Sequence, residues 1–173
     1  MLVHLAEENR TVVVDFRETA PAAAYRDMYF DEDGNVDNTE YRFTHKSSAI
    51  PGSVAGFAHI VDEYGTMTLG DILEASIKLA RDGFPVSYAL AANLHRNTER
   101  LSKNAAIRMK YFKADGSEYE VGEILKQPDL AWTLEQIAQG GADAFYKGDI
   151  ARKGLYYGCS DPRRPGARSV GVD

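Results

Sequence analysis

The chain has 173 residues, enough for one domain with a buried core, and its 44% hydrophobic and 27% charged residues are typical of globular proteins. Twenty basic and twenty-six acidic side chains give a formal charge of −6, which argues against sequence-independent nucleic-acid binding and against adhesion to anionic membranes. The single cysteine, Cys159, excludes an internal disulfide and any site built from several cysteines.

The first segment of the chain predicts an antiparallel hairpin. Residues 1–6 and 10–16 are rich in apolar and β-branched side chains, and the polar residues 7–9 separate them. From residue 17 to about residue 50 the periodicity disappears and turn-forming residues take over, which predicts a long loop of the kind that often has a function. No apolar run approaches the roughly 18 residues of a membrane span, and the first eight residues lack the features of an export signal.

Capping residues and helical spacing predict several helices in the middle of the chain. Pro51 suits a first helical position, Gly65 suits an end, and Gly83 suits a left-handed C-terminal cap. Ser87 is a good N-cap, and Pro128 opens a later helix that Gly140-Gly141 closes. The expected helices cover residues 51–64, 69–82, a stretch from 87, residues 128–138 and a short piece at 143–150.

Two further extended segments are expected near the C-terminal end. Residues 108–121 predict a second hairpin that turns at Asp115-Gly116, because this dipeptide suits a two-residue turn. Residues 154–158 predict a strand, and the rest of the chain is rich in Pro, Gly and Arg without periodicity.

Four oxygen-bearing side chains are spaced like the first ligands of a calcium loop: Asp31, Asp33, Asn35 and Asp37. An EF-hand needs a glycine at the sixth position and a glutamate at the twelfth, where this sequence has Val36 and Arg42. We therefore expect an acidic surface turn and no metal site.

The remaining small and reactive residues favour structural roles. Gly52 and Gly56 lack a phosphate-binding fingerprint, so we expect them to allow close packing of their helix. Cys159 has no evident histidine partner, which argues against a nucleophile. The histidines lack metal-ligand spacing, so ordinary structural roles are expected for His4, His45, His59 and His95.

Arg17 has two interpretations. It directly follows a hydrophobic strand, where its planar five-donor guanidinium can hold a carboxylate in a bidentate pair. The adjacent Glu18 indicates a plain surface ion pair equally well.

A series of motifs, in a specific order and spacing, resembles gamma-glutamyltranspeptidase over about residues 1–151. It begins with Asp15-Phe16-Arg17-Glu18 and includes Pro51-Gly52-Ser53-Val54-Ala55-Gly56. It continues through Tyr64-Gly65-Thr66-Met67, Leu79-Ala80-Arg81-Asp82-Gly83-Phe84, Gln127-Pro128-Asp129-Leu130-Ala131 and Phe145-Tyr146-Lys147-Gly148-Asp149-Ile150-Ala151.

The resemblance implies an α+β fold class, namely part of the αββα sandwich of the N-terminal-nucleophile hydrolases. In that family the precursor cuts itself, and a threonine at the new N-terminus attacks the gamma-glutamyl amide of glutathione. The acyl group then passes to water or to an amino acid or peptide, and no cofactor is implied. Arg17 matches the family's arginine that binds the substrate α-carboxylate. Family members are typically periplasmic, secreted or at the cell surface.

The sequence also departs from the family pattern. Residues 152–173 resemble the last strand and tail of the family's small subunit, so we expect a deletion between them and the segment 1–151. That deletion would remove the autocleavage site, the catalytic threonine and the oxyanion donors. Thr44-His45 is similar to the Thr-His at the cleavage point, but its place before Pro51 matches an ordinary loop.

No catalytic residue is therefore expected in this sequence, and the chain is predicted to be inactive alone. The alternative is a non-catalytic interaction module that pairs with another chain supplying the missing layer, because an uncovered apolar face favours such pairing.

Overall fold

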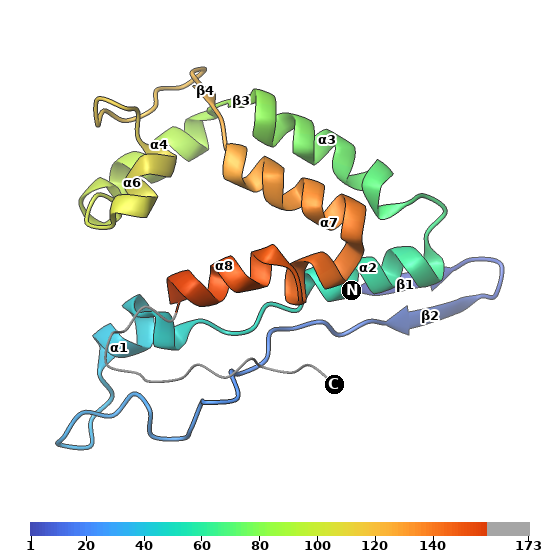
Figure 1. Ribbon diagram of the computed structural model, residues 1–173, viewed down its shortest axis with the longest axis horizontal. Helices are drawn as coiled ribbons and strands as arrows, with labels where there is room; N and C mark the ends of the chain where they lie inside the picture. Colours follow the sequence, from blue (N-terminus) through green and yellow to red (C-terminus); the bar gives the residue numbers. More distant parts are fainter. Residues whose placement is uncertain (159–173) are drawn as a thin grey trace. The chain divides into compact units, whose positions relative to one another are not determined.

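A computed structural model describes residues 1–158, with the backbone alone for residues 43, 45 and 154–158. Two compact units make up the chain: unit 1 contains Met1–Thr66 and the residues from Gly141 onward, and unit 2 contains Met67–Gly140. The secondary structure is mixed, with more helix than strand (Figure 1). No helix of residues 1–158 is both long enough and apolar enough to cross a bilayer.

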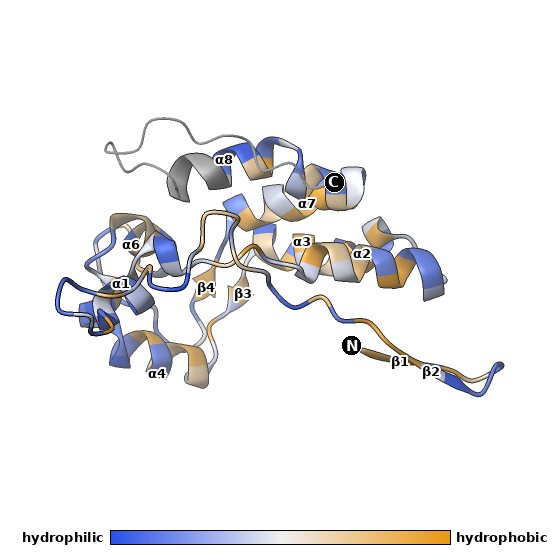
Figure 2. Ribbon diagram, turned by 90° about the horizontal axis from the view of Figure 1, so that it is seen from below, coloured by the Kyte–Doolittle hydropathy of each residue, from blue (hydrophilic) through white to orange (hydrophobic). Residues whose placement is uncertain are grey.

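Unit 1 begins with the predicted hairpin. β1 (Leu2–Leu5) pairs antiparallel with β2 (Arg10–Val13), and Leu2 lies opposite Val13. The connecting turn uses Asn9 at a φ of 46°, a conformation that asparagine tolerates better than most residues. Figure 2 shows apolar colouring along the strands and a polar turn. Leu2 and Val13 are 72% and 73% exposed, so the hairpin buries little of its apolar surface.

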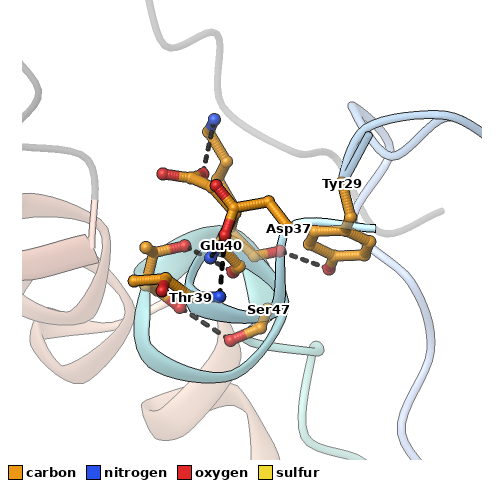
Figure 3. Close-up of polar contacts among 7 residues, drawn as sticks. Tyr29, Asp37, Thr39, Glu40 and Ser47 are labelled. Atoms are coloured by element: carbon orange, nitrogen blue, oxygen red, sulfur yellow. Dashed lines mark hydrogen bonds and ion pairs between the residues drawn. The ribbon is translucent and has the colours of Figure 1, made fainter. Parts of the chain in front are cut away.

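The long loop after the hairpin contains a short helix, α1 (Asn38–Phe43), which the sequence analysis missed. Asp37 starts this helix, because its carboxylate accepts hydrogen bonds from the backbone N–H groups of Thr39 and Glu40 (Figure 3). Tyr29 donates a hydrogen bond to the backbone carbonyl of Lys46 at 2.9 Å, which ties the earlier part of the loop to this helix.

The end of α1 is held by an ion pair and by a hydrogen bond of the Thr44 hydroxyl. Glu40 Oε2 lies 2.7 Å from Lys46 Nζ, so this carboxylate oxygen is paired. Thr44 donates its hydroxyl hydrogen bond to the Glu40 carbonyl at the end of α1, and a 3-10 helix, η1 (His45–Ser47), follows. Thr44 therefore has a local structural contact in the loop, as the sequence analysis expected.

Unit 1 also contains two longer helices. α2 (Ser53–Tyr64) ends where predicted, because the Gly65 N–H donates to the Val61 carbonyl. α8 (Asp149–Gly158) contains residues 154–158, so the strand predicted there is wrong. Asp149 lies in the first turn of α8 and accepts a hydrogen bond from the Arg152 guanidinium. Once a helix has formed, adding residues to it is favourable, and this gain outweighs the weak strand propensity of residues 154–158.

Unit 2 begins with α3 (Leu69–Asp82), which a capping box starts, because Thr68 and Asp71 each accept a hydrogen bond from the other's backbone N–H. Gly83 has a φ of 94°, which confirms that a glycine is needed where this helix ends. Ser87 caps the next helix through the Leu90 N–H. The remaining elements are β3 (Phe84–Pro85), α4 (Tyr88–Arg96), α5 (Thr98–Leu101), α6 (Ala105–Tyr111), β4 (Ile124–Leu125) and α7 (Pro128–Tyr146), of which residues 141–146 belong to unit 1.

The hairpin predicted at residues 108–121 is wrong. Residues 105–111 form α6, because Asn104 caps it by accepting a hydrogen bond from the Ile107 N–H. The predicted turn is present, since Gly116 has a φ of 86° and its N–H donates to the Lys113 carbonyl at 2.8 Å. The strand that pairs in this region is instead β4, which lies antiparallel to β3.

α7 is interrupted at Gly141, whose φ of 60° and ψ of −153° are not helical. The predicted helix stop at Gly140-Gly141 is therefore confirmed as a break in the backbone, and it coincides with the division between the two units.

The buried core lies mainly in unit 2. α3 and α7 run side by side there (Figure 1), joined by an ion pair between Arg81 and Glu135 and by a hydrogen bond from the Gln127 N–H to the Ala80 carbonyl. Among the described residues, the fully buried apolar side chains of unit 2 are Ala80, Val86, Leu94, Phe112, Leu125, Ala131 and Ile137. Unit 1 contributes Ala58 to the same class.

Candidate functional site

A cavity of about 420 Å³ in unit 1 contains Arg17. It lies between the segment that follows β2 and the start of α2, so two of the motifs noted in the sequence meet there. The residues that line it are Met1, Val14, Asp15, Phe16, Arg17, Glu18, Ala49, Pro51, Gly52 and Ser53.

The backbone around Arg17 is held at several points. The Arg17 N–H donates to Asp15 Oδ1 at 3.1 Å. Two residues further along, Thr19 and Ile50 exchange backbone hydrogen bonds of 3.2 and 2.9 Å. The short extended segment is therefore fastened to the chain that leads into α2.

The Arg17 side chain is 82% exposed, and its Nε lies 3.2 Å from Glu18 Oε1. A hydrogen bond from the Glu18 backbone and the Arg17 guanidinium together hold the pKa of the Glu18 carboxyl below its usual value. The surface ion pair suggested by the sequence is thus present. Because such an exposed pair contributes little, a ligand carboxylate can replace Glu18 at the guanidinium.

The first turn of α2 is capped from a distant part of unit 1. Its N-cap residue, Gly52, has no side chain to accept a hydrogen bond. Tyr146 supplies the acceptor, since the Ala55 N–H donates to its hydroxyl oxygen at 3.3 Å, and the hydroxyl donates to the Pro51 carbonyl at 2.6 Å. The motif at residues 145–151 therefore contacts the motif at residues 51–56. Sequence reasoning did not identify this role of Tyr146, because a glycine N-cap does not indicate which side chain replaces it.

Tyr146→Phe is expected to lower the free energy of unfolding by about 1 kcal/mol, because it removes one hydrogen-bond donor and the cap acceptor while keeping the ring. Urea denaturation followed by circular dichroism measures this loss. Tyr25→Phe is the matched control, because Tyr25 is 64% exposed and no hydrogen bond of its hydroxyl is found within residues 1–158. Equal losses in the two variants would contradict the capping role.

The other candidate residues make local contacts. Asp31 Oδ1 accepts hydrogen bonds from the Asp33 and Asn35 N–H groups, which confirms the acidic turn. His4 contacts Thr11 Oγ1 at 3.0 Å. The His59 ring packs edge-to-face against Tyr64, and His95 Nδ1 is hydrogen-bonded to Glu118 Oε2 at 2.8 Å. The ring of His45 and all of Cys159 lie outside the described residues. Among the side chains that the structure describes, no group of three His, Cys, Asp or Glu could hold a metal ion.

The lining of the cavity is suited to binding. Arg17 favours a bound anion through its charge, and the positive end of the α2 dipole lies on the same lining at Gly52 and Ser53. Asp15 and Glu18 contribute negative charge on the same lining. Among the described lining residues, Ser53 has the one hydroxyl and none is histidine, cysteine or lysine.

Comparisons with known proteins agree with the motifs. A family model described as gamma-glutamyltranspeptidase matches residues 1–155. A glutathione hydrolase proenzyme of Escherichia coli (strain K12) is 42% identical over 148 residues, covering 86% of this chain and 26% of that protein. A glutathione hydrolase proenzyme of Bacillus subtilis (strain 168) is 37% identical over 153 residues, covering 88% of this chain and 26% of that protein.

Comparison with solved structures identifies the same family by its fold. The crystal structure of Helicobacter pylori gamma-glutamyltranspeptidase matches with a TM-score of 0.86 and 34% identity, over 91% of this chain and 46% of that one. Such neighbours are N-terminal-nucleophile hydrolases, so the mixed helix and sheet described above is part of that fold. The chain spans about a quarter of the length of the curated relatives it matches.

Proposed function

The chain belongs to the gamma-glutamyltranspeptidase family, and we propose that its part in the family's reaction is to recognise the gamma-glutamyl group of compounds such as glutathione. Arg17 binds the α-carboxylate of that group. The observation that carries the proposal is that Arg17, in the motif Asp15-Phe16-Arg17-Glu18, lines a cavity that is open enough for an amino-acid ligand.

The chemistry of the lining supports this assignment. A planar guanidinium pairs with a carboxylate through two parallel hydrogen bonds, and the positive end of the α2 dipole adds to the attraction. The competing Glu18 carboxylate is held by a solvent-exposed contact, so the exchange for a ligand costs little.

The chain does not turn over substrate by itself. Hydrolysis and transfer both need a nucleophile with a base and an oxyanion site, which together supply most of the rate enhancement. The motifs that the sequence shares with the family over residues 1–151 include no match to the family's catalytic threonine.

Incubation of the purified chain with a chromogenic gamma-glutamyl anilide tests this statement. No release of the anilide above the buffer rate is expected, while L-glutamate still binds. If the chain releases the anilide and Arg17→Ala abolishes that release, the predicted inactivity is wrong, while the binding role of Arg17 stands.

A second candidate function is that of a non-catalytic module that pairs with another chain. The β1–β2 hairpin favours it, because a two-stranded sheet is marginally stable alone and this one exposes Leu2 and Val13. Unit 1 also has a small buried core within its described residues, with Ala58 as its fully buried apolar side chain. Light scattering after size-exclusion chromatography tests this candidate, and a well-folded monomer that takes up no partner contradicts it.

A further inference from the structure

Phe16, the residue before Arg17, lies directly against two glycines, one at the N-cap of α2 and one in its first turn. A Cβ atom added to Gly52 would overlap the carbonyl oxygen of Phe16 and would lie 3.0 Å from the carbonyl oxygen of Arg17. A Cβ atom added to Gly56, one helical turn later, would overlap the Cβ, Cγ and Cδ1 atoms of Phe16. The close packing expected of these glycines is therefore confirmed, and their partner is the segment that contains Arg17.

The requirement for glycine at these positions comes from space and not from backbone conformation. Gly52 has a φ of −97°, which any residue adopts. The overlapping atoms are a backbone carbonyl and the root of an aromatic side chain, neither of which can move aside as the end of a flexible side chain would. Any larger residue must therefore push Phe16 away from α2.

The Phe16 ring also contacts the aromatic residue beside Gly56. It packs edge-to-face against Phe57, with ring centroids 5.3 Å apart, and Phe57 follows Gly56 on α2. Phe16 is half-buried while Arg17 is mostly exposed, so the two neighbouring side chains leave the segment in different directions. The packing of Phe16 against α2 therefore fixes the backbone position from which the Arg17 side chain extends.

We infer that Phe16, seated on Gly52 and Gly56, is a positioning residue that holds Arg17 in the geometry for binding a carboxylate. This inference rests on the proposed function, because it concerns the ligand of Arg17. It adds that the orientation of Arg17 depends on the packing between two motifs, and not on the arginine alone.

The test is a calorimetric titration of the full chain with L-glutamate and with its α-amide. The ratio of the two affinities measures recognition of the α-carboxylate and is independent of the folded fraction of the protein. Wild type is expected to prefer the acid at least about 10-fold, as one well-placed charged contact provides. Gly56→Ala is expected to reduce that preference about 5-fold or more, and Phe16→Leu to reduce it by a smaller factor.

Gly70→Ala is the matched control, because Gly70 lies in the first turn of α3 and a Cβ there would meet its nearest atoms at 3.6 Å, an ordinary contact. It should leave the preference unchanged. If Gly56→Ala does not fold, Phe16→Leu decides the question.

The outcomes separate the inference from the function on which it rests. If Arg17→Ala removes the preference while Gly56→Ala and Phe16→Leu both keep it, the positioning role is wrong and the proposed function stands. If wild type does not prefer the acid, or if Arg17→Ala keeps that preference, the proposed function fails and the inference fails with it.

Discussion

Arg17→Ala is expected to weaken the binding of L-glutamate to the chain by about 10- to 150-fold. The guanidinium lines the cavity, and a hydrogen-bonded contact to a charged group contributes about 1.5–3 kcal/mol, which corresponds to that range. The lower end applies if the bound carboxylate stays in contact with water, because the Arg17 side chain is 82% exposed and solvent screens its charge. Isothermal titration calorimetry at low ionic strength measures the affinity.

Two variants make this test specific. Arg26→Ala removes an arginine of the same segment that is 92% exposed, pairs with Asp27 and does not line the cavity, so it should leave the affinity unchanged. Arg17→Lys keeps the charge but loses the planar fork, and an intermediate affinity is expected. An affinity of Arg17→Ala within a factor of two of wild type would remove Arg17 from the site.

The helices whose ends are marked by local chemistry were predictable from the sequence. Gly65, Gly83 and Ser87 end or begin helices where the sequence indicates, because capping is an interaction among residues close in the chain. The first hairpin was predictable for the same reason, since its register follows from two short strands and one turn.

The errors arise where a local signal has two structural interpretations. Asp115-Gly116 does form a turn, but the residues before it extend from an Asn104 cap as helix α6. The pairing of β3 with β4 joins residues about forty positions apart, and no local pattern specifies such a pair. α1 was missed because six residues are too few to show helical periodicity.

The residues that line the cavity were predictable as separate motifs and not as an arrangement. The sequence indicates Arg17 as a carboxylate ligand and Gly52 and Gly56 as packing residues, but it does not show that Phe16 joins them. Tyr146 lies 95 residues after Pro51, and their hydrogen bond is a product of the tertiary fold. Motif order identifies the family, whereas the contacts between motifs explain why those residues are needed.

Leu125→Ala is expected to lower the free energy of unfolding by about 2–5 kcal/mol, a large share of the roughly 5–15 kcal/mol of an ordinary domain. Leu125 is 1% exposed on β4, where it lies opposite Phe84 of β3, and its truncation leaves a cavity in the core of unit 2. Urea denaturation monitored by circular dichroism measures the loss, with the denaturant dependence checked for a single transition.

The preceding residue of the same strand provides the control for this prediction. Ile124 is 52% exposed, because successive side chains of a strand point to opposite faces, so Ile124→Ala removes a similar volume at the surface. Its expected cost is at most about 1 kcal/mol, since half of the side chain is already in water. A loss in Leu125→Ala no greater than that of Ile124→Ala would contradict the core of unit 2, while a large difference would show that unit 2 packs around β4 in the purified chain.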